Sequence, residues 1–97
     1  MSEEKINSNS IMVGKKPIMS YAKALSIQLK EGNSEVNIRA RGKFISKAVD
    51  VAELATKRLL KNHNLSVKDI KIDTESFEHE GKQINVSTID LKIGKVN

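Results

Sequence analysis

The sequence predicts an α/β fold of the two-layer α+β type, with a mixed four-stranded sheet, two helices and the order βαβαββ. Two short segments of alternating polarity each precede a segment with helical spacing of apolar residues, a pattern typical of β–α units. The final third of the chain has two long alternating segments joined by a turn, which predicts a long β-hairpin. A chain of 97 residues suits one domain, expected over residues 10–97 after a flexible lead at residues 1–9.

The first half of the chain alternates between strand and helix. A short strand is expected over Ser10–Val13, and Gly14 ends it. The next apolar residues have helical spacing, which predicts a helix over Ile18–Glu31. Pro17 can open this helix, because a first helical position needs no N–H donor. Strict alternation then predicts a strand with one buried face over Glu35–Arg41.

A second helix is expected from an N-cap at Ser46 to about Asn62, and it is unusually apolar. Its polar residues form one narrow stripe, so its apolar surface exceeds what packing on a single sheet requires. The helix is either deeply buried or packed on both its own sheet and a second subunit. We favour the second interpretation, because so small a domain has little protein left to cover the outer side. The residues expected at this homodimer interface are Val51, Leu54, Ala55 and Leu59.

The hairpin is expected to pair Val67–Phe77 with Lys82–Lys95, with Gly81 in the turn. In its second strand the apolar residues change parity at Ser87–Thr88. Either a β-bulge lies there, or the distal half of the hairpin buries the opposite face from the proximal half. An arm that becomes polar near its tip can project beyond the domain.

Composition argues against several classes of function. The chain has no cysteine, which excludes disulfides and thiolate metal sites and fits a reducing compartment. It has no apolar run near the roughly 20 residues that cross a membrane. Aromatic residues are 3% of the chain, too few to stack several bases of a single strand. Its histidines, His63 and His79, do not form a metal-ligand spacing, so we expect no catalytic set, metal or cofactor, and no enzyme.

Positive charge is concentrated in one part of the chain. Between Lys15 and Lys61 there are eleven Lys or Arg residues against four acidic ones. Lys15 and Lys16 follow the first predicted strand, while Arg41 and Lys43 follow the second. Parallel neighbouring strands would bring both groups to one edge of the sheet. Any single lysine is best interpreted as a solvated surface charge, but two basic loops at one edge favour a polyanion site.

Two further residues extend this predicted site. Lys47 lies one turn into the second helix, and Tyr21 lies one turn after Pro17, where its hydroxyl could reach the same surface. Lysine outnumbers arginine in the chain, which favours point-charge contacts with phosphate over bidentate reading of bases.

Three segments carry a family resemblance. They read VGKKPIMSY at residues 13–21, IRARGKFISKAVD at residues 38–50 and VSTI at residues 86–89. From about Ile11 to Lys95 the chain resembles the Alba family of small basic archaeal chromatin proteins. The resemblance implies a homodimer through the second helix and the C-terminal strands. It also implies largely sequence-nonspecific binding of double-stranded DNA, with an RNA-binding or ribonucleoprotein role as the alternative. Apart from the resemblance, a purely structural dimerisation module is a third hypothesis.

The resemblance and the basic residues together give a set of expected nucleic-acid contacts. These are Lys15, Lys16, Tyr21, Arg41, Lys43, Lys47 and Lys82. The family also implies acetylation at Lys15, which would lower affinity by removing a charge and would require an acetyltransferase or deacetylase as a partner. The implied location is the cytoplasm, on the chromosome or nucleoid.

The sequence departs from the family pattern at three places. Leu59 stands where some members have an aromatic residue used between dimers, which argues against cooperative filaments. Asn85 stands where arginine is common, and the hairpin tip is acidic at Glu78 and Glu80, with Lys82 as its cation. We therefore expect the hairpin arm to contact nucleic acid more weakly than in family members that have this arginine.

Overall fold

The computed structural model describes residues 9–96, which form two layers. The helices and strands are β1 Ser10–Met12, α2 Ile18–Lys30, β2 Glu35–Arg41, α3 Ile45–Leu54, β3 Leu65–His79 and β4 Lys82–Lys95. The sheet order is β1-β2-β4-β3, with β1 parallel to β2 and the other pairs antiparallel. This confirms the predicted fold class and element order. The predicted lead, apart from Asn9, lies outside the described residues.

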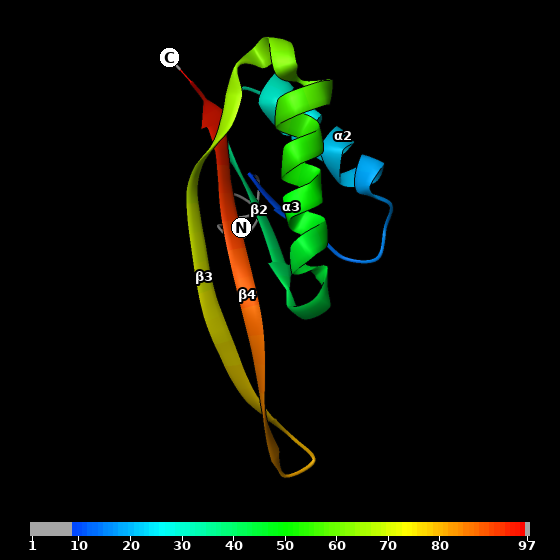
Figure 1. Cartoon of the computed structure of the whole chain (residues 1–97), viewed down its shortest axis with the longest axis vertical. Coiled ribbons are helices and arrows are strands. Elements are labelled where there is room, and N and C mark those ends of the chain that lie inside the picture. Colours follow the sequence, from blue (N-terminus) through cyan, green and yellow to red (C-terminus); the bar gives the residue numbers. More distant parts are fainter. Residues whose placement is uncertain (1–8, 97) are drawn as a thin grey trace.

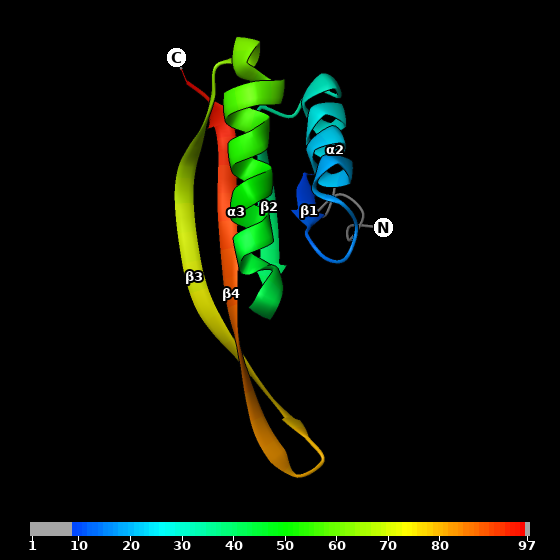
Figure 2. The same cartoon turned by 45° about the vertical axis from the view of Figure 1, so that its right-hand side comes forward.

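One hydrophobic core lies between the sheet and the two helices. Alternation along β2 turns Val36, Ile38 and Ala40 inward, where each is at most 1% exposed. Leu25 of α2 and Val51 of α3 are fully buried against them in the same core. Burying an aliphatic side chain of this size contributes about 1.5–3 kcal/mol, so this core holds both helices on one face of the sheet. Figures 1 and 2 show α3 running along the sheet and α2 beside it.

The start of the second helix differs from the prediction. A 3-10 turn at Gly42–Phe44 precedes α3, and Phe44 is the N-cap. Ser46 therefore lies inside the helix and is not its cap. The sequence favoured Ser46 because of its hydroxyl, but the preceding 3-10 turn already sets the helical direction, so the N-cap lies two residues earlier.

The end of this helix also differs, because α3 continues after Leu54 as a π-helical turn over Ala55–Leu59. The Leu60 N–H donates to the Ala55 carbonyl at 2.9 Å, five residues back. The wider turn directs Leu60 into the core at 8% exposure and leaves Leu59 at 47%. Helical spacing alone could not show this change of winding.

Burial divides the four residues predicted for the dimer interface. Val51 and Ala55 are 0% exposed inside the chain's own core, so the interface prediction is wrong for both. Leu54 is half-buried and Leu59 is exposed. The sequence showed that α3 has two apolar sides but not which side the sheet would cover.

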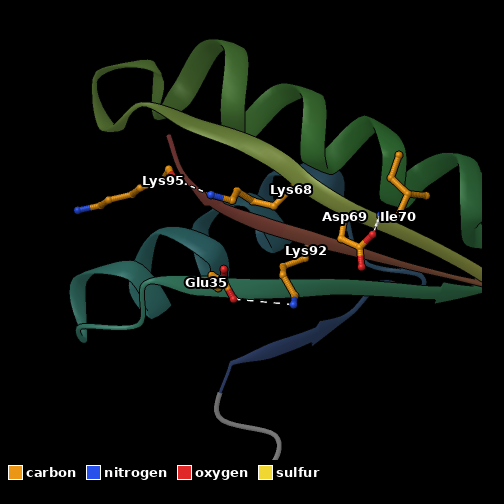
Figure 3. Close-up of polar contacts among 6 residues, drawn as sticks. All are labelled: Glu35, Lys68, Asp69, Ile70, Lys92 and Lys95. Atoms are coloured by element: carbon orange, nitrogen blue, oxygen red, sulfur yellow. Dashed lines mark hydrogen bonds and ion pairs between the residues drawn. The ribbon is translucent and has the colours of Figure 1, made fainter. Parts of the chain in front are cut away.

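A β-bulge lies in β3 at Lys68, between Val67 and Asp69. Val67 pairs with Ile93 and Ile70 pairs with Leu91, so both β3 residues share the helix-facing side of the sheet. Without the extra residue, Val67 and Ile70 would point to opposite faces. Figure 3 shows the bulge region, where Lys68 Nζ donates to the Lys95 carbonyl at 3.1 Å.

The parity change in β4 does not come from a bulge at Ser87–Thr88, because the pairing with β3 is regular there. The apolar residues of the distal half lie instead on the opposite face of the sheet, as the other alternative predicts, but this face is not buried in the single chain, where Phe77 is 43% exposed. Phe77 pairs with Ile84, and these two residues share with Val86 the sheet face that points away from the helices. Glu80 and Gly81 have φ values of 53° and 78°, as a two-residue type I′ turn requires. The resulting arm projects well beyond the helices (Figure 1).

Candidate nucleic-acid interface

The two basic segments lie at the same end of the molecule. The first basic loop, Gly14–Pro17, follows β1 and leads into α2, while the second, Arg41–Phe44, joins β2 to α3. Because β1 and β2 are parallel neighbours, both loops leave the sheet at one edge, as predicted. Figure 2 shows the chain after β1 and the start of α3 at the end from which the hairpin arm projects.

Tyr21 determines the shape of the first basic loop. Its hydroxyl oxygen accepts hydrogen bonds from the backbone N–H groups of Gly14 at 2.8 Å and Lys16 at 3.0 Å. Tyr21 is 9% exposed, whereas Lys15 and Lys16 are exposed. A hydroxyl oxygen has two lone pairs that can accept hydrogen bonds, and both are used by this loop. The buried Tyr21 side chain therefore fixes the backbone of the loop. A direct contact from Tyr21 to nucleic acid stays a prediction.

Lys47 connects the two basic loops. Its ammonium group donates to the Gly14 carbonyl at 2.8 Å, although the residue belongs to the first turns of α3. The same nitrogen lies 5.8 Å from the ring centre of Tyr21 and 5.9 Å from that of Phe44. Lys43 Nζ lies over the Phe44 ring as well, at 5.5 Å. These cation–π contacts hold two positive charges at the junction of the loops.

Arg41 has an internal partner that sequence reasoning missed. Its Nε lies 3.1 Å from Oε1 of Glu75 on β3, and both side chains are about half exposed, at 48% and 53%. Only the register of the hairpin on β2 reveals this contact between distant parts of the chain. An exposed ion pair of this kind contributes about 0–1 kcal/mol, so a phosphate group can compete with Glu75.

Lys82 is not brought together with the basic loops. It begins β4 and pairs with His79 at the end of the hairpin arm. The structure thus joins six of the seven predicted contact residues and leaves Lys82 on a separate, projecting element (Figure 1).

The open face of the sheet carries mixed charge. Arg39 pairs with Asp90 at 3.3 Å, and Lys92 lies 3.9 Å from Glu35 (Figure 3). These carboxylates offset the cations, so the excess positive charge lies at the loops. Within residues 9–96, no three His, Cys, Asp or Glu side chains gather as metal ligands, and no helix has the length and apolarity needed to cross a membrane.

Comparison with known proteins places this arrangement in a family. The family model described as Alba matches residues 9–74. The DNA/RNA-binding protein Alba 1 of Archaeoglobus fulgidus is 48% identical over 87 residues, which cover 90% of this chain and 96% of that protein. The DNA/RNA-binding protein Alba of Methanothrix thermoacetophila is 46% identical over 85 residues, with 88% and 93% covered.

Solved structures agree with the sequence comparisons. Alba from Thermoplasma volcanium superposes with a TM-score of 0.81 at 39% identity, covering 90% of this chain and 100% of that chain. ALBA1 from Trypanosoma brucei gives a TM-score of 0.71 at 26% identity, with 93% and 71% covered. The shared residues and the shared fold lead to one conclusion: the chain belongs to the Alba family.

Proposed function

We propose that this protein is a homodimer that binds double-stranded DNA largely without sequence preference, as a component of the chromosome or nucleoid in the cytoplasm. One observation carries the proposal: the Lys47 bond to the Gly14 carbonyl joins two basic loops into one cationic surface. The similar proteins from A. fulgidus and M. thermoacetophila are named as DNA/RNA-binding, which supports a nucleic-acid ligand.

The basic loops suit phosphate rather than base edges. Lys15 and Lys16 are exposed just before the N-terminus of α2, where free backbone N–H groups and the helix dipole favour an anion. A lysine ammonium is a point charge without the planar fork that reads guanine. Binding through such contacts releases counterions and is insensitive to base sequence.

A second copy would cover the outer apolar surface beside α3. Val49, Ile70 and Ile72 are 40%, 61% and 78% exposed, and the two isoleucines lie on the helix-facing side of the edge strand β3. Large apolar side chains gathered at one edge of a small domain favour a protein contact there. A dimer would place two copies of the basic surface on one assembly, which suits an extended polyanion.

Lys15 is the position in this surface where a lost charge should matter most. It is exposed between Gly14 and Lys16, whose N–H groups are held by Tyr21. Acetylation there would leave the loop shape intact while removing one phosphate-binding charge. An acetyltransferase and a deacetylase are the partners that this regulation would need.

RNA is the alternative ligand, because phosphate contacts carry little information about the sugar. The same loops could follow an A-form backbone. Crosslinking in cells, followed by sequencing of the bound DNA and RNA, would show which nucleic acid predominates.

The proposed lack of sequence preference can be measured with three unrelated duplexes of equal length. We expect dissociation constants within about threefold of one another by fluorescence anisotropy, since the phosphate backbone is common to all three. One duplex bound more than about tenfold tighter would show direct base reading and contradict the mechanism. Absence of binding to all three at low salt would favour the purely structural dimer.

A further inference from the structure

An apolar pocket of about 360 Å³ opens between the two basic loops. It lies at the carboxyl ends of β1 and β2, beside the start of the hairpin arm. Its lining residues are Met12, Val13, Gly14, Arg41, Phe44 and Val86. Met12 is 55% exposed, and Phe44 and Val86 are half-buried, so the apolar floor can be reached from solvent.

Cations surround this apolar floor. Lys43 and Lys47 hold their ammonium groups 5.5 and 5.9 Å from the ring centre of Phe44. Arg41 forms one wall, and its guanidinium is oriented by the 3.1 Å contact with Glu75. The best complement to this arrangement is a flat apolar body that carries a negative charge at its edge. An unpaired nucleotide has both parts.

A regular duplex would leave the pocket unused. Its bases are stacked inside the helix, and its backbone offers phosphates and sugars that gain little from an apolar surface. An unpaired base exposes a planar face, and proteins bind such bases against aromatic rings, aliphatic side chains and arginine guanidinium planes.

We propose that this pocket, with Arg41 as its wall, receives one unpaired nucleobase while the lysines hold the adjoining phosphates. The inference rests on the proposed function but goes beyond it, because it predicts a preference for bulged or looped nucleic acid over uniform duplex. The small number of aromatic residues fits the binding of a single base. Phe44 supplies one ring to the pocket, which suits one base and not a stacked series.

The test compares two otherwise identical duplexes, one fully paired and one with a single unpaired 2-aminopurine. The wild-type protein should bind the bulged duplex at least about fivefold tighter, and the 2-aminopurine fluorescence should change on binding. Met12→Gln and Val86→Gln should each abolish this preference while retaining affinity for the paired duplex. Met19→Gln makes the same change at a methionine of α2 that is 44% exposed and does not line the pocket, so it should retain the preference.

Each other result has a definite meaning. Equal affinity for the two duplexes would overturn the base pocket and leave the proposed function standing. No binding to either duplex would contradict the proposed function itself. If Met12→Gln or Val86→Gln changed the molecular mass in sedimentation, the pocket would belong to a contact between copies of the chain, and the inference would be wrong.

Discussion

Replacing Lys15 and Lys16 together by alanine is expected to weaken binding to duplex DNA by roughly 100-fold at low salt, by about the same factor for every sequence. Both side chains are exposed on a loop whose backbone is fixed by the Tyr21 hydroxyl, so the change removes charge and retains the loop. A dimer would lose four phosphate contacts, which should reduce the magnitude of the salt slope by about 3.5. Fluorescence anisotropy with several unrelated duplexes measures both quantities.

The matched control is Lys30→Ala with Lys61→Ala. Lys30 ends α2 and Lys61 follows the π-helical turn after α3, so both lie at the far ends of helices that begin beside the basic loops. This control removes the same net charge and should change affinity by no more than a fewfold. Loss of affinity for one sequence alone after the Lys15 and Lys16 changes would mean that the loops read bases.

Ile72→Glu is expected to dissociate the homodimer into folded monomers. Ile72 is 78% exposed in the single chain, so a carboxylate there remains hydrated in the monomer but would be desolvated between two subunits. The measurement is the mass by sedimentation velocity, combined with circular dichroism for the fold. Ile27→Glu is the matched control, because Ile27 is a 55% exposed isoleucine on α2, and this variant should remain dimeric.

The same substitution in the core should have a different effect. Val51 is 0% exposed, so Val51→Glu would bury a charge at a cost of several kcal/mol and unfold the chain. A folded dimer of Ile72→Glu would contradict the interface proposed beside α3. Dissociation by Ile27→Glu would instead move the interface to α2.

Local pattern predicted the elements well where a single face is buried. The strand Glu35–Arg41 has its predicted bounds, because alternation of polarity and burial coincide along it. The meeting of the two basic loops also followed from sequence, since parallel neighbouring strands place their ends together. The bulge at Lys68 could not be predicted, because it is defined by pairing with β4 and not by residues around it.

Features that depend on tertiary contacts were missed or misplaced. Val51 and Ala55 were predicted for a subunit interface, but helical spacing cannot tell which apolar side of α3 meets the sheet. The ion pair of Arg41 with Glu75 was not predicted, because only the hairpin register places Glu75 against Arg41. Tyr21 was expected beside the ligand surface, and its hydrogen bonds to the loop show that its oxygen already has two partners.

The salt dependence of duplex binding tests the cationic surface of the basic loops most directly. If a dimer neutralises about six phosphates, a plot of log affinity against log salt concentration should fall with a slope near −5. The wild-type protein and one duplex of mixed sequence suffice for this titration. A slope close to zero would show that phosphate contacts do not drive binding and would contradict the proposed function.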